Sequence, residues 1–155
     1  MPGNSIHIRP CQPSDASAVA DAFLTARARC MPYLPKVRAD QDVRKWIEDV
    51  LCRRPEVWVA ELDGRAVGFA ALREEHLDHL YVHPDFHNRG VGTALLAEAL
   101  RHRPQGMLLW VFQQNAQARR FYERHGFTLL RETDGAGNEE RTPDALYGWR
   151  PAGRA

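Results

Sequence analysis

Two glycines and an arginine occur together in the segment His87-Asn88-Arg89-Gly90-Val91-Gly92, just before a helical pattern begins. Glycine lets a backbone approach a ligand closely, and the first N–H groups of a helix have no partner inside the helix. Such a helix start binds phosphate, and the Arg89 guanidinium would add a fixed positive charge. The glycines alone would favour a simple tight connection. A Walker loop and a dinucleotide fingerprint are excluded, because no lysine follows the glycines and Leu95 stands where a third glycine is required.

The surrounding sequence favours the phosphate-binding interpretation. The segment is similar to the pyrophosphate loop of the GCN5-related N-acetyltransferase family, usually written Q/R-x-x-G-x-G/A, although His87 stands where the family has Gln or Arg. Leu80-Tyr81-Val82-His83-Pro84 resembles the end of the family's fourth strand. The segment 115–127 resembles the family's N-x-x-A-x-x-F-Y-x-x-x-G-F motif. The order of expected elements also matches, so the resemblance covers nearly the whole chain.

This resemblance implies an enzyme that moves the acetyl group of acetyl-CoA to a primary amine by direct attack, without a metal. Tyr122 would face the sulfur and protonate the departing thiolate, and a backbone N–H near Leu80 would hold the oxyanion. Ordinary helical packing is the alternative role for the Tyr122 ring. The residues that the resemblance implies for coenzyme binding are Leu80, Tyr81, Val82, His87, Asn88, Arg89, Gly90, Val91, Gly92, Thr93, Asn115, Ala118 and Arg119.

A general base is also required, because free amines are mostly protonated at neutral pH. In the resembled family the base commonly lies on the fourth strand, which makes His76, Asp78 and His79 the candidates. Alternation puts His76 and Asp78 on one face and His79 on the other, unless a bulge shifts the phase. We expect Asp78 to act as the base with His76 behind it, while a plain surface charge explains each of them equally well.

The acceptor is expected to lie between two loops, 31–35 and the region around 138–140. Tyr33 and Leu34 could form an apolar wall, and Glu139 with its neighbour Glu140 could hold a cationic substrate. Core packing of Tyr33 and Leu34 and a solvated turn at Glu139 are equally compatible with the sequence. The acceptor could be a small amine or a protein amino group.

The hydrophobic pattern predicts the elements that position these residues. Strands are expected at 5–9, 57–62, 66–72, 77–82, 107–112, 127–130 and 145–149, and helices from about 15, at 40–51, at 92–103 and at 115–125. Asp63-Gly64 predicts a hairpin turn. The second helix should bury Trp46, Ile47, Val50 and Leu51, and the continuous apolar run 107–112 should be buried on both faces.

These elements predict an α/β fold: a mixed, mostly antiparallel sheet of about seven strands with helices on both faces. The resemblance adds a V-shaped splay between strands four and five. A length of 155 residues fits one domain spanning 1–155. The net charge of +1 argues against a nucleic-acid partner, and no apolar run is long enough for a membrane span. We expect a cytoplasmic protein, and by family analogy a homodimer.

Two other functions are weighed against this one. His76, His79, His83 and His87 have helical spacing and could line a metal site, but Pro84 interrupts any such helix and the segment reads better as a strand. A non-catalytic acyl-CoA-binding or sensory module is the stronger alternative, because it needs the same loop without an acid or a base.

Overall fold

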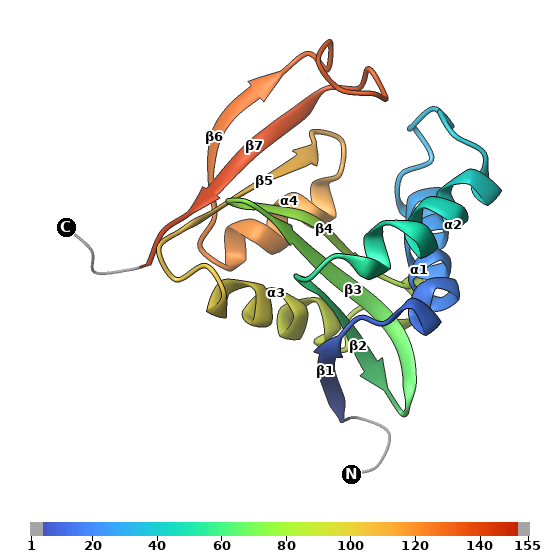
Figure 1. The fold of residues 1–155 in the computed structure, drawn as a ribbon. Coiled ribbons are helices and arrows are strands. Elements are labelled where there is room, and N and C mark those ends of the chain that lie inside the picture. The colour runs from blue at the N-terminus through green and yellow to red at the C-terminus, as the bar shows by residue number, and fades with distance from the viewer. Residues whose placement is uncertain (1–4, 152–155) are drawn as a thin grey trace.

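The computed structural model describes residues 5–151 and contains one mixed sheet of seven strands in the order β1-β2-β3-β4-β5-β7-β6 (Figure 1). All neighbouring strands are antiparallel except β4 and β5, which run parallel. This confirms the predicted fold class. The strands are β1 (Ile6–Pro10), β2 (Val57–Leu62), β3 (Arg65–Arg73), β4 (His76–Val82), β5 (Met107–Phe112), β6 (Thr128–Thr133) and β7 (Asp144–Trp149).

The helices cover the two faces of the sheet unequally. They are α1 (Ala16–Cys30), α2 (Asp40–Asp49), α3 (Val91–Arg101) and α4 (Ala116–Arg124). One core cluster joins α1 and α2 to β2 and β3, and the other joins α3 and α4 to the opposite face and to β5 and β7. Figure 1 shows that α1 and α2 lie beside the β1–β4 half only, so one face of the β5-β7-β6 half is left without a covering helix among the described residues.

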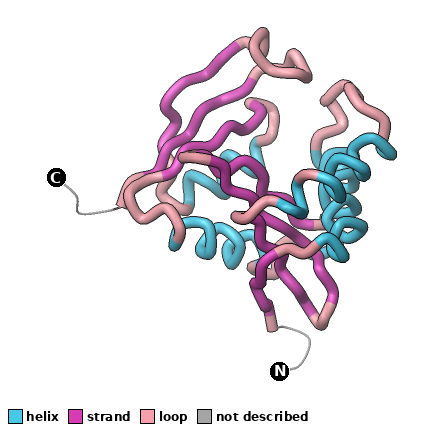
Figure 2. The backbone as a smooth tube through the Cα atoms, viewed as in Figure 1, coloured by secondary structure: helices cyan, strands magenta, loops and turns pink. Residues whose placement is uncertain are grey.

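Strands β4 and β5 are paired at one position only, His76 with Leu108, and separate beyond it (Figure 2). The backbone N–H of His83 donates to Val67 O on β3 over 2.8 Å. Since hydrogen-bonded pairs alternate along an antiparallel ladder, the N–H and C=O groups of Leu80 and Val82 face away from β3 and into the gap. The predicted splay therefore exposes backbone hydrogen-bonding groups of β4.

Two predictions about burial were wrong. Ile47 and Leu51 are fully buried, but Trp46 and Val50 are 41% and 44% exposed, because α2 touches the core along a narrow stripe. Strand β5 is buried on one face only: Trp110 is 42% exposed, since no helix of the described chain covers that side. The Asp63-Gly64 turn is confirmed, with positive φ at both residues.

Residues 1–4 and 152–155, and with them the two ends of the predicted domain, lie outside the described residues. Within residues 5–151, no helix combines the length and apolar character needed to cross a bilayer.

Candidate active site

A cavity of about 240 Å³ lies between the end of β4, the start of α3 and the helix α4, and is called the loop cavity below. Its lining includes every residue that the sequence assigned to coenzyme binding except Arg89 and Arg119. Those lining residues are Leu80, Tyr81, Val82, His87, Asn88, Gly90, Val91, Gly92, Thr93, Asn115 and Ala118. Two separate segments of the chain, 80–93 and 115–118, thus converge on one space.

The start of α3 presents free backbone donors to this cavity. Gly90 has φ +84°, a left-handed conformation that costs glycine little and turns the chain sharply into the helix. No side chain among the described residues caps this helix, so the first-turn N–H groups are left for a ligand. Val91, Gly92 and Thr93 all line the cavity. A helix start of this kind is suited to an anion such as a phosphate.

The His87 side chain ties the loop to the end of β4. Its Nε2 lies 2.9 Å from Val82 O, so Nε2–H donates to one of the β4 carbonyls that face the gap. This contact takes up the Val82 carbonyl but leaves the backbone donors of Leu80 and Val82 free. His87 therefore ties the loop to β4 from the position where the resembled motif has Gln or Arg.

Tyr122 lies on the buried face of α4 and lines the same cavity. Its ring packs edge-on against Phe121 and Phe127, and its hydroxyl makes no hydrogen bond within residues 5–151. Burial raises the pKa of Tyr122 well above the ordinary tyrosine value. The phenol therefore stays protonated across the usual pH range and is available as a hydrogen-bond donor. Asn115 caps α4 by accepting from the Ala118 N–H over 3.2 Å.

Four predicted residues are not brought to the loop cavity. Arg119 lies on the other side of α4, where it donates to Tyr147 Oη at 2.9 Å and to Glu132, because helical spacing turns Ala118 and Tyr122 inward and Arg119 toward β7. The Arg89 guanidinium lies over the Phe86 ring, 5.6 Å from its centroid. His76 and Asp78 lie further down β4, outside the cavity.

The predicted alternation along β4 also fails at Asp78. The pairing of β3 with β4 shifts at this point, because Leu72 pairs with Leu77 but Ala71 pairs with His79, so Asp78 is an extra bulged residue. Its carboxylate lies 3.2 Å from Arg54 Nη1 and 3.6 Å from His79 Nε2. Burial lowers the pKa of His79, which packs among aromatic rings. Asp78 thus faces Arg54 and His79, away from the loop cavity.

Two further cavities adjoin the two loops, 31–35 and 138–140, that the sequence assigned to the acceptor. The α1–α2 cavity, of about 370 Å³, is lined by Leu34 and Glu139, two of the residues that the sequence assigned to the acceptor, and also by Arg27 and Glu140. Tyr33 does not line it; its hydroxyl is buried without a hydrogen-bond partner among the described residues. Glu139 is largely exposed, whereas Glu140 is only 15% exposed and pairs with Arg27 over 2.8 Å. The structure therefore favours Glu140 over Glu139 as the buried carboxylate of this region.

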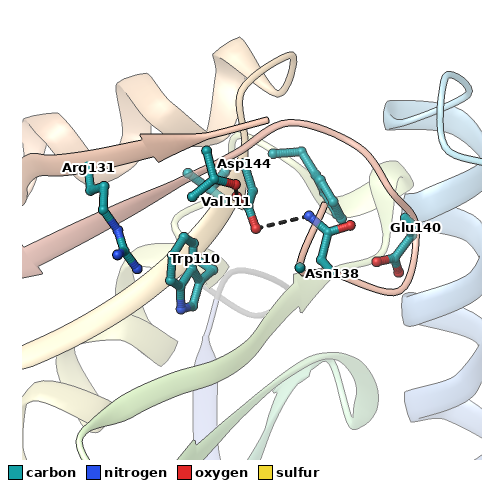
Figure 3. A pocket seen from close by; sticks show the side chains of 9 residues that line it. Trp110, Val111, Arg131, Asn138, Glu140 and Asp144 are labelled. Carbon is teal, nitrogen blue, oxygen red and sulfur yellow. Dashed lines mark hydrogen bonds between the residues drawn. The ribbon is translucent and has the colours of Figure 1, made fainter. Parts of the chain in front are cut away.

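The β5–β7 cavity, of about 560 Å³, occupies the uncovered face of the sheet, and Glu140 lines it as well (Figure 3). The sequence did not single out most of its residues, because they become neighbours only when β5, β6 and the 134–143 loop meet. Sequence reasoning also missed Ala26, Cys30, Phe86, Gln117, Phe121 and Arg124 in the loop cavity, and it assigned Met31 to the acceptor loop instead. Helical spacing from Ala118 and Tyr122 could have found Phe121.

Within residues 5–151, no group of three His, Cys, Asp or Glu side chains is placed to hold a metal ion. His76 and His79 are on a strand, while His83 and His87 lie in the turn after it, so the four histidines do not share a helix face.

Gly135 shapes the loop that carries Glu140. It has φ +87°, and a Cβ at this position would overlap the backbone of Thr142. We expect Gly135→Ala to displace the 134–143 loop and with it Glu140. This should lower kcat/KM for an acceptor about tenfold, because a small misplacement of a reacting group slows the reaction strongly. The Kd of the coenzyme should not change, as isothermal titration calorimetry can measure. Weakened coenzyme binding in a folded variant would contradict the view that the 134–143 loop serves the acceptor and not the coenzyme.

Comparisons with known proteins agree with this geometry. Residues 53–129 match the family model described as an acetyltransferase (GNAT) domain. The peptidyl-lysine N-acetyltransferase YjaB of Salmonella typhimurium is 38% identical over 109 residues, covering 68% of this chain and 74% of that protein. The peptidyl-lysine N-acetyltransferase YiaC of Escherichia coli is 28% identical over 144 residues, covering 92% and 95%.

A solved structure shares the fold. The Salmonella typhimurium protein yncA, determined with its cofactor acetyl-CoA, superposes with a TM-score of 0.71 at 21% identity, covering 97% of this chain and 96% of its own. The architecture and the sequence relatives lead to one conclusion: this chain belongs to the GNAT acetyltransferase family.

Proposed function

We propose that the chain transfers the acetyl group of acetyl-CoA to a primary amine, with Tyr122 as the general acid. The observation that carries this proposal is one cavity that unites the uncapped start of α3, the free backbone of β4 and the Tyr122 side chain. The phosphate groups of the coenzyme fit the uncapped start of α3. A pantetheine amide fits the free backbone of β4, and the leaving thiolate fits the Tyr122 hydroxyl. The names of the relatives and the acetyl-CoA of yncA support the same interpretation.

Different groups of the chain would act at the successive steps of the reaction. The Leu80 N–H, which points into the gap, stabilises the oxyanion that develops as the amine nitrogen attacks the thioester carbonyl. The C–S bond then breaks, and Tyr122 gives its proton to the leaving thiolate. The proton lost by the attacking nitrogen passes to a carboxylate on the acceptor side. Glu140 and Asp144 line the β5–β7 cavity, whereas Asp78 is held by Arg54 outside it.

The acceptor amine would enter between the two acceptor loops, on the side of the sheet opposite α3. Peptidyl-lysine relatives make a protein amino group one candidate, and a small amine is the other. Among residues 5–151, one side of the edge strand β6 has no neighbouring strand and could pair with a second copy, which supports a homodimer. The single-domain organisation, the cytoplasmic location and the absence of a nucleic-acid partner stay predictions.

The direct test is release of free thiol from acetyl-CoA in the presence of a panel of amines and lysine peptides. We expect acceptor-dependent release, with mass spectrometry showing the acceptor heavier by one acetyl group. Tight coenzyme binding without thiol release for any acceptor would instead favour the non-catalytic binding module.

A further inference from the structure

We propose that the acceptor carries an anionic group remote from its amine, and that Arg131 binds this anion. The inference rests on the proposed function and narrows its substrate class. It is argued from the β5–β7 cavity, which is lined at separate points by Arg131 and Asp144. Neither side chain has an oppositely charged partner among the described residues.

Arg131 is placed to receive a ligand. Its guanidinium lies over the exposed ring of Trp110, 5.4 Å from the ring centroid, and both residues line the cavity. Within residues 5–151 its side chain has no hydrogen bond and no ion pair. A guanidinium on an aromatic face keeps its N–H edge available for a carboxylate or a phosphate.

Three other arginines of this region are each paired with a carboxylate. Arg27 pairs with Glu140 over 2.8 Å, Arg119 pairs with Glu132 over 3.0 Å, and Arg38 pairs with Glu139. The chain thus satisfies these three cations internally, in contrast with Arg131.

Asp144 provides the opposite charge in the same cavity. Its carboxylate accepts hydrogen bonds from the Thr133 hydroxyl and from Asn138 Nδ2, the latter at 3.0 Å, and both partners are uncharged. Figure 3 shows Arg131 and Glu140 at opposite sides of the cavity, with Trp110 and Asp144 between them. Asp144 and Arg131 are not within ion-pair distance of each other, so each can serve a different end of one ligand.

The orientation of that ligand follows from the strand order. Arg131 lies on β6, the outermost strand, and β5 and β7 separate it from β4. Glu140 is linked to β4, because its partner Arg27 lies 3.4 Å from Tyr81 Oη, and Tyr81 lines the loop cavity. The amine end therefore belongs near Glu140 and Asp144, and the anionic end belongs on Arg131 with the connecting chain over Trp110.

The test compares matched acceptors that differ only in the remote charge. 6-Aminohexanoate is compared with hexylamine, and glycine serves as an amino acid whose charges are too close together. We expect kcat/KM for 6-aminohexanoate to exceed that for hexylamine about tenfold, since a charge-assisted hydrogen bond has this effect. Lysine peptides with a free or an amidated C-terminus, and with Glu or Ala beside the lysine, distinguish a peptide source of the anion from a free amino acid.

Arg131→Ala should abolish this preference while leaving kcat/KM for hexylamine unchanged, and Arg131→Lys should retain part of it. Arg73→Ala, at the exposed end of β3, is the control for the change in net charge. Equal kcat/KM for charged and uncharged acceptors in the unchanged protein would overturn the proposal, as would a preference that survives in Arg131→Ala.

A binding measurement separates this inference from the proposed function. Hexanoate has no amine to acetylate, and its binding should change the fluorescence of Trp110, which a Trp110→Phe variant identifies among the four tryptophans. The signal should be lost in Arg131→Ala. If no amine is acetylated but this signal is present and depends on Arg131, the transferase function fails and the anion site stands. If amines are acetylated and hexanoate gives no signal, the anion site fails alone.

Discussion

Replacing Gly90 with valine is expected to weaken acetyl-CoA binding about 100-fold, because the backbone N–H donors at the start of α3 would no longer converge on the phosphates. Gly90 adopts φ +84°, and a β-branched residue is a genuine outlier at such an angle. A Cβ there would meet only the Ile6 side chain, at 3.8 Å, so the effect comes from backbone conformation rather than from a clash. Calorimetric titration of acetyl-CoA measures the loss.

The chain offers a matched control for this variant. Gly64 adopts φ +77° in the β2–β3 turn and, like Gly90, has room for a Cβ. Gly64→Val should therefore cost a similar free energy of unfolding, about 1–3 kcal/mol for a strained backbone, with the coenzyme Kd unchanged. Equal coenzyme affinity in the two variants would show that the start of α3 is not the phosphate site.

Tyr122→Phe is expected to lower kcat about 100-fold to 1,000-fold, since positioned general acids contribute on this scale. The hydroxyl has no hydrogen-bond partner among the described residues, and the ring remains to pack on Phe121 and Phe127. Neither the free energy of unfolding nor the Kd of acetyl-CoA should change much. Steady-state kinetics, calorimetry and thermal melts together check this combination.

Tyr147 is the matched control, because it is also a buried tyrosine of the same core cluster. Its hydroxyl accepts from Arg119 at 2.9 Å and donates to Glu123 at 2.7 Å. Tyr147→Phe should therefore lose about 1–3 kcal/mol of stability while kcat is retained. If both variants lose kcat equally, the phenol of Tyr122 is not acting as a specific acid.

The pH profile gives an independent check of Tyr122. Burial raises its pKa above the ordinary value near 10, so the acid form persists to higher pH than a free phenol would. Activity lost by deprotonation of Tyr122 should therefore appear only above about pH 10. A fall in kcat between about pH 8 and pH 9.5 that disappears in Tyr122→Phe would contradict the raised pKa.

Much of the fold could be predicted because its signals are local. The Asp63-Gly64 turn and the helices expected at 92–103 and 115–125 each depend on a few neighbouring residues. The residues of the loop cavity were largely found from the resemblance of the segments 80–84, 87–92 and 115–127 to motifs of the GNAT family. Only the backbone donors at the start of α3 follow from the glycines and the helix after them.

Other features could not be predicted because they depend on distant segments. The exposure of Trp110 follows from the lack of a helix, among the described residues, over one half of the sheet, which its own apolar run does not reveal. The bulge at Asp78 is set by the register with β3, and the burial of Glu140 rather than Glu139 depends on Arg27 in α1. Arg119 points from α4 toward Tyr147 and not into the loop cavity, although in the sequence it stands between the predicted site residues Ala118 and Tyr122.

The central claim is that the N–H groups at the start of α3 bind the diphosphate of acetyl-CoA. Titration of the ¹⁵N-labelled protein with coenzyme A, followed by amide NMR, tests it most directly. The account predicts that the amides of Gly90, Val91, Gly92 and Thr93 shift most, together with those of Leu80 and Val82 in β4. Saturable binding that leaves these amides unmoved while shifting others would contradict it.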